Sequence, residues 1–227
     1  MISKRLSAIV NLIKNDNNIA DIGSDHGYVL LELRKKGFVS RLMGVENKKN
    51  PFLHLKENVA KSGYQNIECV YSDGLNDVDN EFKTIVIAGM GFDIIKNIIL
   101  SNKEKLKHIN NIIIDSHTDK SKVRPFFISL GYDIDDEVVI FEDEIYYDLV
   151  SFKKCNNIQK YTMEELEFGK INLLNKSNDF KNMIIDEINK NIFIIQKIND
   201  PSSLRVGELN KRNDYLRGII KWKLKHY

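Results

Sequence analysis

The chain has 227 residues, of which 42% are hydrophobic, and its formal net charge is +2. This length suffices for one domain of about 150 residues with a full core and a smaller second one. No uncharged apolar run approaches the roughly 20 residues of a membrane span, and the first residues lack the apolar core of a signal peptide, so we expect a cytoplasmic protein that spans no membrane. Cys69 and Cys155 have no metal-ligand spacing, and we expect neither a metal nor a disulfide.

Over the first 155 residues, apolar runs of strand length alternate with helical patterns, which indicates a parallel sheet covered by helices. The expected strands cover residues 19–23, 42–46, 67–71, 84–88, 111–115, 132–141 and 145–152. Helices are expected after Ser3, from about His26, from Pro51 and through Val123. Only three residues separate the last two strands, so these two must form an antiparallel hairpin.

The most specific local pattern runs from Ile19 to Gly27, where an apolar strand ends in a glycine turn that opens into a helix. Such a turn lets backbone amides approach a nucleotide, and a carboxylate about 20 residues on, here Glu46, suits a ribose diol. The turn reads G-S-D-H-G rather than G-x-G-x-x-G, and Asp25 would repel a pyrophosphate. It would tolerate the cationic sulfonium and α-amino group of S-adenosylmethionine. The turn therefore favours S-adenosylmethionine over NAD.

Five motifs together point to a narrower group: S-K-R-L near the start, A-D-I-G-S-D-H, S-D-G-L from Ser72, I-A-G-M-G, and the F-E-D-E-I-Y-Y hairpin. In combination they resemble the TrmK family of bacterial tRNA adenine-N1 methyltransferases over essentially the whole chain. The resemblance implies a Rossmann-like class I methyltransferase domain, to which the helical spacing in the tail, described below, adds a C-terminal α-helical hairpin of coiled-coil type. It also implies methylation of N1 of adenine 22, in the D-arm of tRNA. Phe92 and the corner Asp115-Ser116-His117 depart from the family pattern, in turns that would face the target base.

The resemblance further implies cofactor contacts on the loops that follow the strands. They are Asp21, Ile22, Gly23, Ser24, Asp25, His26, Glu46, Asn47, Asp73, Gly74, Ala88, Gly89, Met90 and Gly91. Glu46 would bind the ribose, and Asp73 with Gly74 would lie at the adenine of the cofactor. Structural alternatives exist: Asp21 and Asp25 could simply cap a helix, and the glycines could serve close packing of a helix on the sheet.

The chemistry can be argued from the residues themselves. Neutral adenine N1 carries an in-plane lone pair and attacks a sulfonium methyl directly, so alignment and charge matter more than a strong base. The corner A-G-M-G lacks the Asn/Asp-Pro-Pro-aromatic pattern usual for methylation of the exocyclic amine, which favours a ring nitrogen. Asp25 is the candidate to ease the product cation, with His26 and His117 as hydrogen-bonding partners of the base. His117 could also be an ordinary loop histidine.

The tail differs from the rest. From Thr162 to Lys225 apolar residues recur at helical spacing, with a break at 199–203, which predicts an antiparallel helical hairpin. Residues 156–227 hold 13 Lys and Arg against 9 Asp and Glu. Phosphate binding follows as a hypothesis, and a solvated helix face is the alternative. The expected RNA contacts are Lys4, Arg5, Arg205, Lys211, Arg212, Arg217 and Lys221, with Lys223 and Lys225 in the same basic stretch.

These interpretations combine into one prediction. Residues 1–158 form an S-adenosylmethionine-binding methyltransferase domain, and residues 159–227 a helical hairpin that binds tRNA. We expect an enzyme that methylates an adenine in tRNA, with a monomer favoured. Two alternatives remain: a methyltransferase for a small molecule or a protein, and a non-catalytic RNA-binding protein with a methyltransferase-like fold.

Overall fold

The computed structural model describes residues 2–15 and 17–221, so Lys223 and Lys225 lie outside the described residues. The chain divides into two compact units, Met1–Lys160 and Tyr161–Tyr227. This division lies two residues beyond the expected one. Among the described residues, no helix has the length and apolar character needed to cross a membrane.

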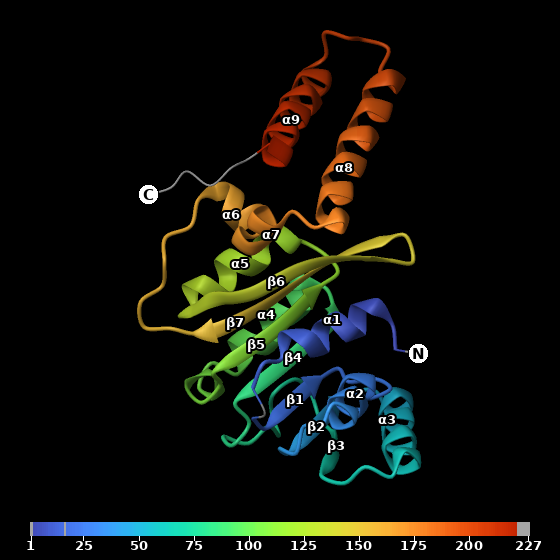
Figure 1. The fold of residues 1–227 in the computed structure, drawn as a ribbon, viewed down its shortest axis with the longest axis vertical. Helices are drawn as coiled ribbons and strands as arrows, with labels where there is room; N and C mark the ends of the chain where they lie inside the picture. The colour runs from blue at the N-terminus through green and yellow to red at the C-terminus, as the bar shows by residue number, and fades with distance from the viewer. Residues whose placement is uncertain (1, 16, 222–227) are drawn as a thin grey trace. The chain divides into compact units, whose positions relative to one another are not determined.

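The first unit is built on a seven-stranded sheet (Figure 1). Its strands, in chain order, are β1 (Ile19–Ile22), β2 (Leu42–Glu46), β3 (Ile67–Tyr71), β4 (Thr84–Met90), β5 (Asn111–Ser116), β6 (Tyr132–Glu142) and β7 (Ile145–Lys154). In space they follow the order β3-β2-β1-β4-β5-β7-β6. The first five pair in parallel, whereas β7 runs antiparallel to both neighbours. The direction of winding reverses between β1 and β4, which is where α/β sheets bind ligands.

One helix of this unit precedes β1, and the others follow β1, β2, β4 and β5. They are α1 (Lys4–Leu12), α2 (Tyr28–Lys35), α3 (Lys49–Ser62), α4 (Phe92–Ser101) and α5 (Lys120–Ser129), with a short 3-10 turn at Lys105–Lys107. The predicted α/β fold with its antiparallel end hairpin is confirmed. Helix α4 was not expected, because its β-branched sequence F-D-I-I-K-N-I-I-L lacks a clear start signal. Tertiary packing decides it, since Ile95 and Ile99, one turn apart, are both fully buried.

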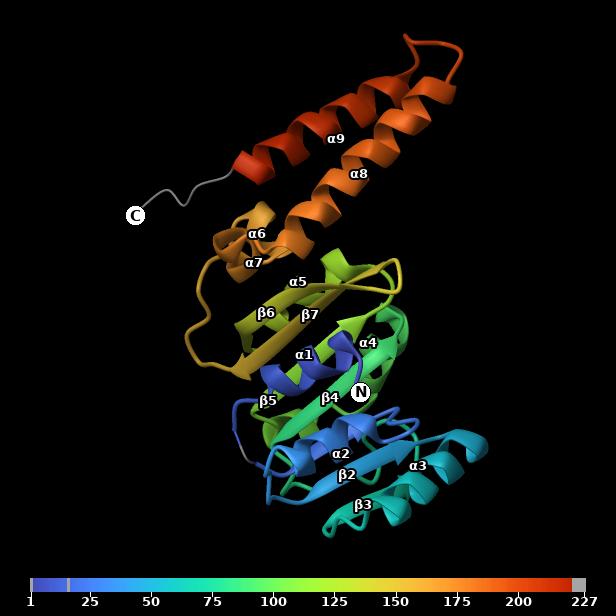
Figure 2. The same ribbon diagram turned by 45° about the vertical axis from the view of Figure 1, so that its right-hand side comes forward.

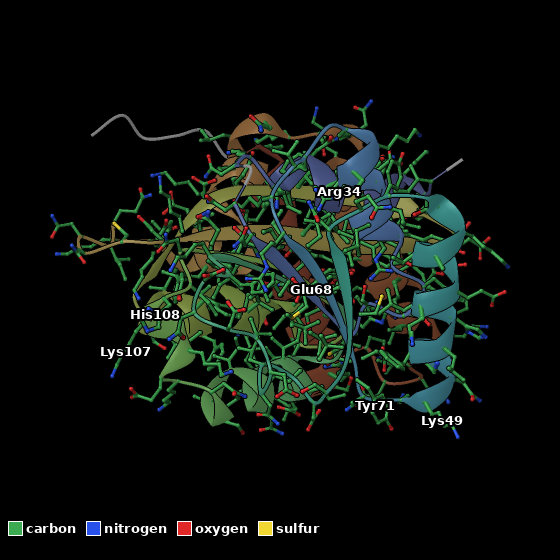
Figure 3. All side chains as sticks on the ribbon, turned by 90° about the horizontal axis from the view of Figure 1, so that it is seen from below. Arg34, Lys49, Glu68, Tyr71, Lys107 and His108 are labelled. Atoms are coloured by element: carbon green, nitrogen blue, oxygen red, sulfur yellow. The ribbon has the colours of Figure 1, made fainter. Side chains whose placement is uncertain are left out.

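Two arginines bind segments of the first unit together. Arg124 on α5 is fully buried and donates to Glu137 on β6 at 2.7 Å and to Asp148 on β7 at 2.8 Å. Arg34, labelled in Figure 3, donates to the carbonyl oxygens of Gln65 and Asn66 and so joins α2 to the loop before β3. These ties hold both ends of the sheet in place around its centre.

Helix α1 lies in front of the strands in Figure 2 and packs on α2, β6 and β7. Its Ser3 cap accepts a hydrogen bond from the Leu6 amide at 3.2 Å, as expected for a serine at a helix start. The tip of the β6–β7 hairpin reaches the same end, where Glu142 accepts from the amides of Lys4 and Arg5 at 2.6 and 3.0 Å. This contact fixes the start of α1, and with it the Arg5 side chain.

The second unit is helical. It comprises α6 (Met163–Phe168), α7 (Lys170–Asn175), α8 (Asn178–Lys197) and α9 (Leu204–Lys221). The long pair α8 and α9 forms the expected hairpin, whereas the short helices α6 and α7 were not expected. Inside the α8–α9 seam, Asn191 donates to Asn213 at 2.9 Å, and both side chains are buried.

Candidate active site

A cavity of about 490 Å³ opens at the carboxyl ends of β1, β2 and β4. Eleven of the fourteen predicted cofactor residues line it: Ile22, Gly23, Asp25, Glu46, Asn47, Asp73, Gly74, Ala88, Gly89, Met90 and Gly91. Sequence reasoning missed Val45, Lys48, Pro51, Ser72, Ile94 and Ile98, which complete the wall. The last two belong to the unexpected helix α4. The predicted loops therefore meet at one place, as their positions after parallel strands require.

A second cavity, of about 390 Å³, adjoins the first. The two share Gly23, Asp25, Ala88 and Gly89. Around this shared strip the second cavity is lined by Arg5, Leu6, Asp21, Ser24, His26, Tyr28, Val29 and His117. The three remaining predicted cofactor residues, Asp21, Ser24 and His26, thus line the second cavity alone. Of the residues predicted to act on the base, His26 and His117 also line only this cavity, and Asp25 lies in the shared strip.

Gly23 lines both cavities. Its φ of +74° lies in the left-handed region, and a Cβ atom there would stand 2.2 Å from the Met90 Cε atom. The amides of Gly23 and Ser24 both donate to the Val45 carbonyl oxygen, at 2.8 and 3.1 Å, which binds the turn to β2. A side chain at position 23 would therefore strain the turn and displace the Met90 side chain, which lines the first cavity.

Asp21 is a buried carboxylate beside the shared strip. Burial raises its pKa to about 6, opposed by a hydrogen bond from the Ser24 hydroxyl at 2.7 Å. The neighbouring Glu46 carboxylate raises the pKa of Asp21 further, and Arg5 lowers it. The helix-capping alternative is wrong for Asp21 and Asp25, because α2 has Gly27 as its N-cap and no side-chain hydrogen bond there. Because burial disfavours the charged form of Asp21, a cation bound nearby would stabilise that form.

The carboxylates at the end of β2 and after β3, Glu46 and Asp73, line the first cavity. Glu46 is only 7% exposed and accepts from the Lys48 amide at 3.0 Å. Asn47 donates through its side-chain amide to Asp73 at 2.8 Å. This bond joins the loops after β2 and β3, so that the predicted ribose and adenine contacts come as one connected wall.

Arg5 is held in place over the second cavity. Its Nε donates to Asp115 Oδ2 at 2.6 Å, and its guanidinium lies 4.9 Å from the centre of the Tyr147 ring. Asp115 is fully buried, and its other oxygen has no hydrogen-bond partner among the described residues. Tyr147 also packs edge-on against His117, at 6.2 Å between ring centres. Of the two departures from the family pattern, the 115–117 corner reaches the second cavity through His117.

Phe92, the other departure, lines neither cavity. It is 5% exposed and packs edge-on against Phe126 on α5, with 5.6 Å between ring centres. Its amide donates to the Thr118 hydroxyl at 3.1 Å. The expectation that this turn would face the base is wrong for the Phe92 side chain, because α4 begins there and turns the ring into the core.

Asp25, His26 and His54 bring their possible metal-ligating atoms within 4.8 Å of one another. The two imidazole rings, however, stack 5.3 Å apart with planes only 9° from parallel. A ring nitrogen directs its lone pair within the ring plane, so stacked parallel rings do not point at one ion. We therefore interpret these rings as a stack rather than as a metal centre.

The predicted RNA contacts fall into three groups. Lys4 is exposed at the start of α1, whereas Arg5 points into the second cavity. On α9, Arg212 is engaged by Glu167 at 2.6 Å and Glu187 at 2.7 Å and lies over the Phe168 and Tyr215 rings. Arg205 and Arg217 pair with acids one turn away, while Lys211 and Lys221 are exposed and make no ion pair within residues 2–15 and 17–221. The geometry gives Arg212 a structural task that its sequence position did not reveal.

This strand order, with a carboxylate at the end of β2 and a glycine turn at the switch point, defines a Rossmann-like class I methyltransferase. Residues 2–150 match the family model described as a methyltransferase domain. The Bacillus subtilis tRNA (adenine(22)-N(1))-methyltransferase is 32% identical over 151 residues, an alignment covering 66% of this chain and 63% of that protein. MG248 of Mycoplasma genitalium is 30% identical over 171 residues, or 73% of this chain and 76% of that protein.

Among solved structures, M. capricolum TrmK in complex with S-adenosyl-homocysteine superposes with a TM-score of 0.83 at 29% identity. The superposition covers 97% of this chain and 98% of that one. The chain belongs to the TrmK family.

Proposed function

We propose that this protein transfers the methyl group of S-adenosylmethionine to N1 of an adenine in tRNA, at position 22 in the D-arm. One observation carries the proposal: two cavities of nucleotide size meet at the shared strip of Gly23, Asp25, Ala88 and Gly89. The cofactor would occupy the first cavity and the target adenine the second, so that the methyl group crosses at the strip. The name of the B. subtilis relative supplies the substrate and the atom.

Within the first cavity, the proposed contacts follow from chemistry. Glu46 would accept hydrogen bonds from the ribose hydroxyls, and Asp73 with Gly74 would lie along the adenine of the cofactor. Ala88 to Gly91 would form the floor beneath the sulfonium. The close approach that Gly23 allows would admit the methionine part of the cofactor without a clash.

Charge supports the same assignment. Positive charge resides on the sulfonium before transfer and on the methylated adenine afterwards, so it moves by only a bond length or two. Asp25 on the shared strip and Asp21 beside it are the carboxylates placed to stabilise both states. N1 attacks with its own lone pair, and no residue needs to remove a proton from it. His26 and His117, on the walls of the second cavity, would then hold the base by hydrogen bonds.

For the second unit we propose contacts with the tRNA phosphates through exposed cations of α9. Lys211 and Lys221 are the first candidates, followed by Arg205 and Arg217, while Arg212 mainly ties α9 to the α6 and α8 carboxylates. Replacing both lysines by alanine should lower the slope of log affinity against log salt by about 1 to 2. Lys96→Ala, at another exposed lysine on α4, is the control. An unchanged slope would remove the two lysines from the interface.

The deciding experiment incubates the purified protein with labelled S-adenosylmethionine and an unmodified tRNA transcript, followed by nucleoside analysis. We expect 1-methyladenosine, and no label on a transcript in which adenine 22 is replaced by uridine. Cofactor binding without any methyl on tRNA would contradict the proposal and favour a small molecule or protein as acceptor. A tRNA substrate would also place the enzyme in the cytoplasm, and light scattering tests the predicted monomer.

A further inference from the structure

A third cavity, of about 680 Å³, lies beyond the proposed adenine cavity between α1, α2 and the end of α3. Its lining consists of Ile2, Ser3, Leu6, Tyr28, Leu31, Glu32, Lys35, Ser62 and Tyr64. Leu6 and Tyr28 line both this outer cavity and the adenine cavity. The proposed methyl transfer makes no use of the outer cavity. Leu6 and Tyr28 are the lining residues that connect it to the adenine cavity.

Tyr28 stands at the boundary as a supported but exposed ring. It is 50% exposed, and it stacks on His26 with 5.3 Å between ring centres and 21° between planes. His26 in turn stacks on His54 of α3 at 5.3 Å. The Asn58 side chain donates to the His26 carbonyl oxygen at 3.0 Å, which fastens this loop to α3. The stack fixes where the Tyr28 ring lies while leaving half of its surface open.

The rest of the outer cavity suits a flat, partly apolar ligand. Leu6 and Leu31 supply aliphatic surface, and Tyr64, itself 38% exposed, is a second aromatic ring. Ser3 and Ser62 also line the cavity, where their hydroxyls already accept from the Leu6 and Tyr64 amides at 3.2 Å each, so each oxygen can accept one more hydrogen bond. Aromatic rings beside polar groups are how proteins bind unstacked bases, because every base has a face that stacks.

A base that leaves its stack to react exposes the face of the base beside it. The backbone keeps that neighbouring nucleotide within one nucleotide length of the target. We propose that the outer cavity binds the nucleotide adjacent to the target adenine, with its base stacked on Tyr28. This inference rests on the proposed function, and it makes Tyr28 a residue that positions the RNA while the target base is out of its stack.

The test is a double-mutant cycle that combines a substitution in the protein with a change in the tRNA. The rate of methylation under single-turnover conditions is measured for the wild type and Tyr28→Leu, on tRNA and on tRNA with an abasic residue at the 5′ or the 3′ neighbour of the target. For one of the two neighbours, we expect each single change to cost about tenfold and the combination to cost little more than one change alone. Tyr28→Phe keeps the ring and should stay close to wild type.

Tyr71→Leu is the matched control, since Tyr71 is 57% exposed, lines none of the three cavities, and lies at the end of β3 (Figure 3). Should Tyr28→Leu fail to fold, Tyr64→Leu enters the same cycle from another wall of the cavity. Losses that multiply to about a hundredfold at both neighbours would overturn the inference while leaving the proposed function intact. Failure of the wild type to methylate any tRNA would overturn both.

Discussion

Replacing Asp21 by asparagine tests the electrostatics at the centre of the site. In the fold, burial raises the pKa of Asp21 to about 6, against an ordinary value near 3.8. A raised pKa means that the native state prefers the protonated carboxyl, so the charged form weakens the fold once the pH exceeds the unfolded value. The pKa shift of about two units corresponds to about 3 kcal/mol in the free energy of unfolding, which the wild type loses as the pH rises from about 4 through about 6.

Asparagine is neutral at every pH and can still accept the hydrogen bond that Ser24 donates to Asp21. We therefore expect Asp21→Asn to gain stability relative to the wild type as the pH rises. About half of the 3 kcal/mol, roughly 1.5 kcal/mol, should develop between pH 5 and pH 8. Urea unfolding followed by circular dichroism at a series of pH values measures this difference. The contribution of the helical second unit is the same in both proteins and cancels when they are compared.

The same substitution at the exposed Asp77 measures what the change from carboxyl to amide does by itself. A difference between Asp21→Asn and the wild type that stays flat with pH would refute the reasoning. So would a difference that shrinks as the pH rises, because it would mean that the folded protein stabilises the charged carboxylate rather than the neutral one.

Three further predictions concern other parts of the chain. Arg124→Met leaves two acids buried without their cation and should cost about 3–5 kcal/mol, seen as a large drop in the urea midpoint of the first unit. Asn191→Leu alone leaves the buried side-chain oxygen of Asn213 without its donor and should cost about 1–3 kcal/mol, whereas changing both residues to leucine should recover most of that loss. Equal stability of the single and double variants would contradict this. Glu46→Gln should weaken binding of S-adenosylmethionine in calorimetry and leave tRNA binding unchanged, and an unaltered cofactor affinity would remove Glu46 from the ribose.

Local patterns in the sequence were enough for most of the sheet and for one side of the site. Each predicted strand is an apolar run bounded by turn residues, and the three residues between the last two predicted strands leave only an antiparallel pairing. Residues that follow parallel strands must gather at one edge of the sheet. The cofactor residues around Gly23, Glu46 and Gly89 could therefore be predicted to lie together, and they line one cavity.

Other parts of the site depended on contacts between distant segments. The bond from Arg5 to Asp115 joins residues 110 positions apart, and no local pattern marks either as the partner of the other. In the same way, Arg212 looks like any exposed basic residue in the sequence, but Glu167 and Glu187 come from two other helices to meet it.

The sequence by itself determined the class of fold, the glycine turn and the order of chemical groups along it, because dihedral angles and strand burial follow from neighbouring residues. Only the tertiary structure decided that these groups divide between two cavities with a common strip, and that Tyr28 borders a third. Cavities are the space that packed elements leave between them. Their shape therefore depends on how α1, α2 and the β6–β7 hairpin pack, which no single stretch of sequence encodes.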